Sequence, residues 1–366
     1  LKRNLTTEEI ARFEVRNYRF PDIQIAERYS RENLYPYLFS HSIGYVGNLD
    51  EEKLQEILSS QELESNETIF TYSNGFLNGK TGIEYVYDEK LRGLFGKKIY
   101  EVDASGRLLQ EKQMIPAVAG EDIFTSLDLP SQKVAYDELN NRRGAVVAVD
   151  INDGSIVTYV SSPSFSVNKI ANGLTQNEFD ELINDDDKPF FDRAAQVRYS
   201  PASTIKPAIG LFGIDKDILD WEYTIQDPGF FILPEDGRIY RGWKKGGHGE
   251  INLKDAIIES SNTFFFSLAY QTEIEELRAH LSNFGFGKNV CDDCFMPDNG
   301  LLPSPRWKMN THNFGWFKGD TVNVGVGQGY INATPIQLAY YSAFLATKGN
   351  INKFSFVQDS KNANKN

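Results

Sequence analysis

The chain has 366 residues, enough for two or three domains with a buried core in each. Its 38 basic and 51 acidic residues leave a net charge of −13, which argues against a phosphate-binding surface and so against a nucleic-acid partner. The chain contains neither an apolar run long enough to span a membrane nor a signal-type leader. The composition favours a globular protein with a neutral or cationic ligand.

Residues 1 to about 120 are predicted to form mixed helix and strand. The stretch TTEEIARFEV at 6–15 carries a capping box followed by a helical pattern. The stretch KKIYEVDASGRLL at 97–109 predicts a hairpin around a Ser-Gly turn. The GKTG sequence at 79–82 is not a phosphate-binding loop, because Gly75 and Gly79 enclose three residues where that loop needs four.

A β-sheet is predicted to begin near residue 143. The stretch at 121–139 predicts a strand and a helix, and two β-rich runs within 143–165 then flank Asn152-Asp153-Gly154, a strong hairpin signal. We therefore expect a domain boundary between about 120 and 135. Farther along, helices are predicted at 203–214, 253–260 and 263–285, the last two split by a Ser-Ser-Asn corner.

The two cysteines form a single CDDC motif, Cys291 and Cys294. A zinc site would need two further ligands at matched spacing, and none is evident. Three interpretations stay open: a loop-closing disulfide, two free thiols, or a metal site.

Ser203 and Lys206 lie three residues apart in YSPASTIKPAIG at the expected start of a helix. The plain interpretation is a helix cap and a solvated lysine. The alternative is a nucleophile with its base, since residues three apart on a helix share a face. A lysine can take the serine proton only when its pKa lies well below the usual value of about 10.4, and burial has that effect.

The corner ESSNTFF adds Ser260 and Asn262, two residues apart. On their own they are typical of helix capping. On a bent loop, however, both side chains could project into one cleft. The hydroxyl would then pass a proton to a leaving amine, and the amide would hold a substrate carbonyl.

Together these motifs resemble those of the penicillin-binding transpeptidases. Longer stretches, among them VRNYRFPDIQI, FDRAAQVRYSPASTIKP, YRGWKKGGHG and VGVGQGYINATPIQLA, are similar to class B members of the penicillin-binding protein 2 type, over nearly the whole chain. The resemblance implies an α+β fold in two parts. Residues 1–125 would form a pedestal domain of the dimerisation type. Residues 126–366 would form an α/β/α transpeptidase domain, related to serine β-lactamases and lacking its C-terminal strands.

The resemblance also implies peptidoglycan cross-linking during cell elongation. Ser203 would form the acyl-enzyme, with Lys206 as base, Ser260 as proton relay and Asn262 positioning the donor amide. The expected ligands are peptidoglycan stem peptides and β-lactams, and the expected partners are a polytopic glycan polymerase and the scaffold of the rod elongation complex. The expected location is the periplasmic face of the inner membrane, with an N-terminal anchor that this chain does not include.

Three departures from the family pattern matter. The family's Lys-(Ser/Thr)-Gly strand is expected after VGVGQGY, and no such tripeptide follows there. Some members hold a zinc ion beside the active site through two Asp, one His and one Cys. Here Asp227 and His248 match, but Gly242 and Ser261 replace the other two ligands, so we expect no metal and no other cofactor. The third departure is that the family's membrane anchor is not found in this sequence.

Two other functions are weighed against transpeptidation. A serine β-lactamase would not need a pedestal of more than a hundred residues. A truncated, non-catalytic family member could instead keep the pedestal and act as a binding or scaffold protein.

Overall fold

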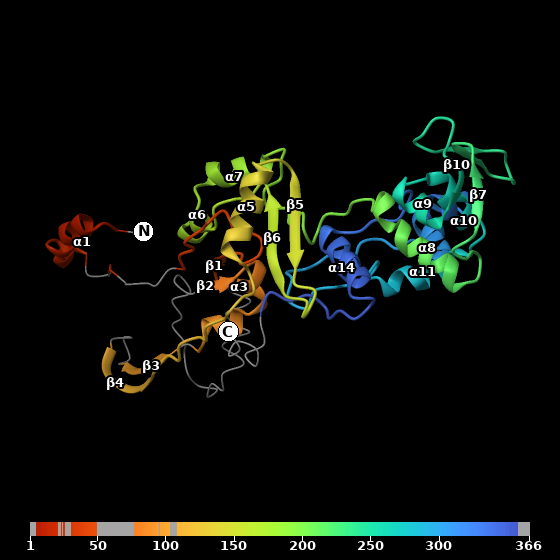
Figure 1. Cartoon of the computed structure of the whole chain (residues 1–366). Helices are drawn as coiled ribbons and strands as arrows, with labels where there is room; N and C mark the ends of the chain where they lie inside the picture. Colours follow the sequence, from red (N-terminus) through yellow and green to blue (C-terminus); the bar gives the residue numbers. More distant parts are fainter. Residues whose placement is uncertain are drawn as a thin grey trace.

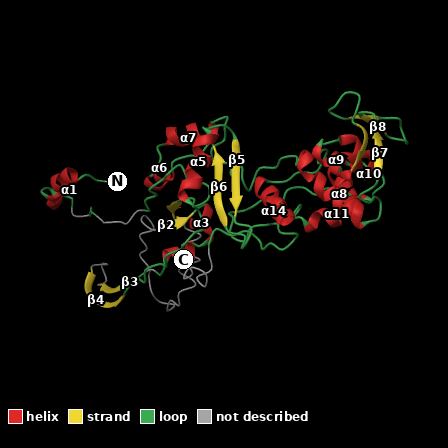
Figure 2. Ribbon diagram, in the orientation of Figure 1, coloured by secondary structure: helices red, strands yellow, loops and turns green. Residues whose placement is uncertain are grey.

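The computed structural model describes residues 5–20, 23, 25, 31–49, 77–94, 96–102 and 108–357. In Figure 1 a β-hairpin occupies the middle of the molecule and a group of helices lies at one end. Figure 2 shows that helices dominate that end and that short strands lie at its margin. All the sheets of the described residues are two-stranded and antiparallel.

The N-terminal part is built from short elements. They are α1 (Thr7–Glu14), the 3-10 turn η1 (Asn17–Arg19), β1 (Val46–Asn48), β2 (Leu77–Gly79), α3 (Gly82–Val86), α4 (Asp88–Arg92), β3 (Lys97–Val102) and β4 (Leu108–Ile115). As predicted, Thr6 and Glu9 form the capping box of α1. Strands β3 and β4 form the predicted hairpin, and its Ser-Gly turn lies outside the described residues.

The central part contains the predicted β-hairpin. Its elements are α5 (Leu129–Leu139), β5 (Gly144–Val149), β6 (Ile156–Ser162), α6 (Val167–Asn172) and α7 (Gln176–Asn184). Strands β5 and β6 pair antiparallel around the Asn-Asp-Gly turn. The strand expected before α5 is reduced to an isolated bridge between Thr125 and Val357.

The remaining elements carry the motifs. They are η2 (Ala202–Ile205), α8 (Lys206–Asp215), β7 (Thr224–Asp227), β8 (Phe230–Ile232), β9 (Ile239–Arg241), β10 (Gly249–Asn252), α9 (Leu253–Ile258), α10 (Asn262–Tyr270), α11 (Ile274–Asn283), α12 (Pro305–His312), α13 (Lys318–Val324) and α14 (Pro335–Ala346). The single helix expected at 263–285 is thus two helices. The break comes at Thr272, whose hydroxyl donates to the carbonyl of Ala269 (2.8 Å) and ends α10.

Two apolar cores organise these elements. The larger core lies among α8, α9, α10, α11 and α13, with Ile209, Phe212 and Phe265 almost fully buried. The second core joins Ile83 of α3 to β6, α14 and the segment around Phe354. Helix α5 packs against β6, and α14 packs against β5. The hairpin is therefore the element on which the central helices assemble.

A buried carboxylate ties the second core together. Cys291 and Cys294 are joined by a disulfide, which settles the three interpretations of the CDDC motif. Between them, Asp293 is only 3% exposed. It accepts hydrogen bonds from the hydroxyls of Tyr87 (3.1 Å) and Ser355 (2.7 Å) and from the N–H of Phe356 (2.9 Å). The motif thus links α3 and the segment near residue 355 through one buried acceptor.

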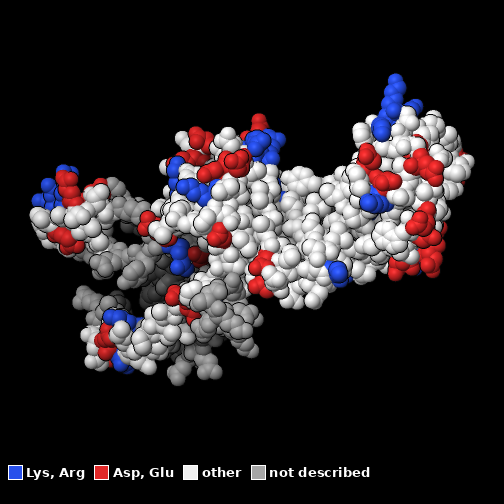
Figure 3. Space-filling model, viewed as in Figure 1, with Lys and Arg blue, Asp and Glu red and all other residues white. Residues whose placement is uncertain are grey.

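The surface is unevenly charged. Figure 3 shows Asp and Glu side chains at both ends of the face in view, with Lys and Arg among them. The band between the hairpin and α8 is mostly uncharged, and it is there that α14, which has no charged residue, lies. In the described ranges no helix combines the length and the apolar character that crossing a bilayer requires.

Candidate active site

Ser203 and Lys206 lie where a short 3-10 turn becomes a helix. Ser203 is exposed in η2, and Lys206 is the first residue of α8, with Pro207 in the first turn. Proline is tolerated there because its missing N–H has no helical partner to lose. The sequence interpretation of a helix start is therefore confirmed.

The turn before Ser203 is fixed by its neighbours. Ala202 has a φ of +49°, and its N–H donates to the carbonyl of Gly327 (2.9 Å). A Cβ at Gly327 would lie 2.2 Å from the carbonyl oxygen of Ala202, so only glycine allows this approach. The VGVGQGY stretch thus packs directly against the turn that presents Ser203.

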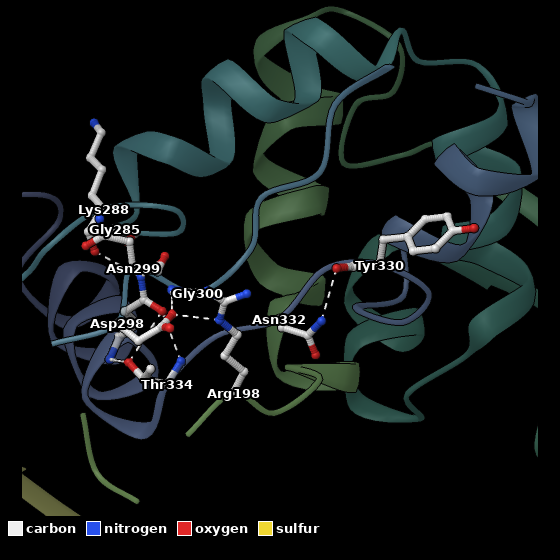
Figure 4. Close-up of polar contacts among 10 residues, drawn as sticks. Arg198, Gly285, Lys288, Asp298, Asn299, Gly300, Tyr330, Asn332 and Thr334 are labelled. Carbon is white, nitrogen blue, oxygen red and sulfur yellow. Dashed lines mark hydrogen bonds and ion pairs between the residues drawn. The ribbon is translucent and has the colours of Figure 1, made fainter. Parts of the chain in front are cut away.

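Farther back, the same segment is anchored by an ion pair. Arg198 Nε lies 2.7 Å from Asp298 Oδ1, and the same carboxylate accepts the N–H of Gly300. Figure 4 shows Arg198 directed at this carboxylate. Tyr199 then pairs with Ala333 through two backbone hydrogen bonds of 2.8 Å. The chain approaching Ser203 is held on both sides.

Lys206 is buried and faces the Ser-Ser-Asn corner. Its side chain is 2% exposed. Its Nζ donates to the carbonyl oxygen of Ser260 (2.8 Å), to Ser260 Oγ (3.2 Å) and to Asn262 Oδ1 (2.8 Å). Burial lowers the pKa of Lys206 to about 8. At pH 7 a base with that pKa is neutral in about one molecule in ten, far more often than an ordinary lysine.

The corner itself joins α9 to α10, as predicted. Ser260 adopts a left-handed φ of +54°, which is uncommon for a residue other than glycine. The helix cap is neither Ser260 nor Asn262 but Ser261, whose side chain accepts the N–H of Phe264. Ser260 and Asn262 are thereby left free to face Lys206, so three of the four predicted site residues are in direct contact. Ser203, the fourth predicted residue, lies one helical turn before Lys206.

Asp227 contacts this corner through Ser261, and His248 contacts Asp227. Asp227 Oδ2 is 2.6 Å from His248 Nδ1 and 2.8 Å from Ser261 Oγ, and Oδ1 accepts the N–H of Gly229 (2.7 Å). Burial acts to raise the pKa of Asp227, but the hydrogen bonds from His248 and Gly229 outweigh it, so that pKa is lowered. Sequence analysis considered Asp227 as a possible zinc ligand, and it missed the contact with Ser261.

These residues do not fit a four-ligand zinc site. His248 Nε2 is buried and has no hydrogen-bond partner among the described residues. Nevertheless, within the ranges that the structure covers, no three His, Cys, Asp or Glu side chains are grouped so that they could hold a metal ion. Gly242 supplies no ligand, and the hydroxyl of Ser261 already donates to Asp227. One carboxylate and one imidazole are too few for a structural zinc ion.

We therefore expect the protein to purify without zinc, because half of a zinc ligand set is missing. Elemental analysis should give well below one zinc ion per chain, and a chelator should leave the melting temperature unchanged. Gly242→Asp combined with Ser261→Cys restores the missing ligand types and serves as the positive control. Stoichiometric zinc in the unmodified protein, lost together with thermal stability in His248→Ala, would contradict the expectation.

Comparisons with known proteins show the family of the chain. The family model "Penicillin binding protein transpeptidase domain" matches residues 144–366, and "Penicillin-binding Protein dimerisation domain" matches residues 1–125. The chain belongs to the penicillin-binding protein transpeptidase family. The predicted α+β fold with a pedestal and a transpeptidase domain is thereby confirmed.

The relatives of this family member include peptidoglycan D,D-transpeptidases named MrdA. The chain is 39% identical to MrdA of Acinetobacter baumannii, over 95% of this chain and 50% of the relative. It is 35% identical to MrdA of Escherichia coli, over 95% of this chain and 54% of the relative. The chain spans about half the length of these curated relatives.

Solved structures give the same family. PBP2 of Helicobacter pylori, in its complex with MreC, superposes with a TM-score of 0.82 at 29% identity, over 96% of this chain and 64% of that one. PBP2 of Pseudomonas aeruginosa, in complex with WCK 5153, gives 0.76 at 33% identity, over 92% and 68%. The predicted similarity to penicillin-binding protein 2 is confirmed.

Proposed function

We propose that the protein is a serine D,D-transpeptidase that cross-links peptidoglycan stem peptides during cell elongation and is acylated by β-lactams. The observation that carries this proposal is the buried Lys206, whose Nζ contacts Ser260 and Asn262 one helical turn from the exposed Ser203. Curated relatives named as peptidoglycan D,D-transpeptidases support the same reaction.

In the proposed reaction, Ser203 Oγ attacks the carbonyl of the penultimate D-Ala, and neutral Lys206 takes its proton. The N–H of Ser203, in the first turn of η2, faces the developing oxyanion. Lys206 then passes this proton to Ser260 Oγ, 3.2 Å from its Nζ, as Ser260 gives its own proton to the departing D-Ala amine. The peptide bond breaks and an ester on Ser203 remains. The amine of a neighbouring stem attacks this ester and forms the cross-linking amide. The ester bond to Ser203 breaks, and the proton lost by the amine returns to Ser203 Oγ. Asn262 orients the donor amide throughout.

The two domains have different roles in the proposed function. Residues 1–125 serve as the pedestal, and residues 126–366 carry the chemistry. The H. pylori relative was solved in complex with MreC, which supports a protein of that type as a partner of this chain. The proposed partners are a scaffold protein of the elongation complex and a glycan polymerase. The site of action would be the periplasmic face of the inner membrane.

A peptide-transfer assay tests the proposal. A donor peptide ending in D-Ala-D-Ala and an amine acceptor are expected to give free D-Ala and the joined peptide in equal amounts, measured by mass spectrometry. A donor ending in L-Ala is the control and should give neither. If no D-Ala is released, the scaffold function replaces catalysis, and rapid turnover of penicillin would point to a β-lactamase.

A further inference from the structure

We propose that Asp227 is a positioning residue for the catalytic corner and acts through the hydroxyl of Ser261. The inference rests on the proposed function, because it assigns a role in the same reaction. Asp227 contacts neither Ser203 nor Lys206 in the hydrogen bonds of the described residues. Its effect must therefore pass through the corner.

Ser261 is the link. It is fully buried, at 0% exposed, and it lies between Ser260 and Asn262 in the chain. Its Oγ accepts the N–H of Phe264 (3.2 Å) and donates to Asp227 Oδ2 (2.8 Å). These two hydrogen bonds fix the Ser261 side chain and with it the local backbone. The neighbours of Ser261 on that backbone, Ser260 and Asn262, bind Lys206.

Asp227 is a firm anchor for this link. It ends β7, opposite Gly249 of β10, and its side chain is 1% exposed. Because an ionised carboxylate only accepts hydrogen bonds, His248 Nδ1 is the donor in their 2.6 Å contact. Three donors, from His248, Gly229 and Ser261, converge on one buried carboxylate. Such charge-assisted hydrogen bonds are short and strong, so the carboxylate has little freedom to move.

The loop between β9 and β10 makes a second contact with the corner. Trp243 Nε1 donates to the carbonyl oxygen of Glu259 (3.1 Å), and the Trp243 ring lies 5.6 Å from that of His248. A Cβ at Gly247 would lie 2.0 Å from the carbonyl oxygen of Asp227, so this loop lies directly against Asp227. The β7–β10 ladder and the loop thus contact the corner at Ser261 and Glu259.

The corner needs such support because its backbone is strained. Ser260 is held at a φ of +54°, a conformation that persists in a non-glycine residue only when surrounding contacts impose it. In this conformation both its carbonyl and its hydroxyl face Lys206 Nζ. Without the Asp227 contact we expect the corner to relax and these acceptors to move away from Lys206.

Acylation kinetics with a fluorescent penicillin test the inference. Asp227→Ala and Ser261→Ala are each expected to slow acylation by about tenfold to a hundredfold, the effect of a small misplacement of catalytic groups. The double variant should be no slower than the slower single variant, because both changes break one link. Asp227→Asn keeps an acceptor oxygen for Ser261 and should lose clearly less than Asp227→Ala.

The matched control is Asp236→Asn. Asp236 is an exposed carboxylate in the turn between β8 and β9. It accepts the N–H of Arg238 (2.9 Å) and lies 3.6 Å from the guanidinium of the same residue. Its variant should acylate at the original rate. An unchanged rate in Asp227→Ala would overturn the inference, and so would a double variant whose loss equals the product of the two single losses.

A second measurement separates this inference from the proposed function. Amide hydrogen exchange needs no reaction, and we expect it to quicken in Asp227→Ala for the peptide covering 259–264 while the peptide from α11 stays unchanged. If the original protein is not acylated but exchange quickens in this way, the proposed function fails and the inference about the corner stands. Unchanged exchange at 259–264 would overturn the inference.

Discussion

Ser203→Ala is expected to abolish covalent labelling by penicillin. The hydroxyl oxygen is the atom that forms the ester, and alanine has no atom to replace it. The change removes one exposed oxygen from η2, so the fold should be unaffected. Labelling with a fluorescent penicillin, followed by gel electrophoresis, measures the effect.

Ser342→Ala is the control for this variant. Ser342 is an exposed serine of α14 whose hydroxyl donates to the carbonyl of Leu338 (2.9 Å), and its loss should leave labelling intact. Persistent labelling of Ser203→Ala at the original rate would show that another nucleophile carries the reaction.

Lys206→Arg is expected to slow acylation by about 10² to 10⁴, the usual contribution of a general base. Arginine keeps the charge and can still donate to Ser260 and Asn262, but a guanidinium does not lose its proton in a protein. Lys216→Arg, at the other end of α8, is the control, because arginine can keep its ion pair with Glu276. Nearly normal acylation of Lys206→Arg would mean that another residue is the base.

The pH dependence of acylation checks the same role. Lys206 must be neutral to accept a proton, and burial lowers its pKa to about 8. The rate should therefore rise as the pH increases through about 8 and level off above it. A rate that keeps rising toward the ordinary pKa of lysine would show that Lys206 is not the base in its buried state.

The local signals of the sequence predicted much of this site. A serine and a lysine three residues apart at a helix start share a face, and both lie at that start in the structure. Ser260 and Asn262 could be expected on a corner because helix patterns end and begin around them. Hairpin β5–β6 was equally readable, since Asn-Asp-Gly between β-rich runs is a strong local signal.

The contacts that hold the site residues in place could not be predicted from local sequence signals. Arg198 and Asp298 are a hundred residues apart, and Asp227 and Ser261 are 34 apart, so no local pattern relates them. The role of Ser261 was hidden further by its neighbours, because any residue of the Ser-Ser-Asn corner is a good helix cap. Only the packing of β7 against the corner decides which of the three makes the cap and which face Lys206.

Mapping of the penicillin adduct is the most direct test of the central claim, that Ser203 is the nucleophile of a penicillin-binding transpeptidase. The protein is labelled, digested and analysed by mass spectrometry. We expect one adduct, on the peptide that contains Ser203, with fragment ions that place the added mass on that serine. An adduct on Ser260, or on any other residue, would contradict it.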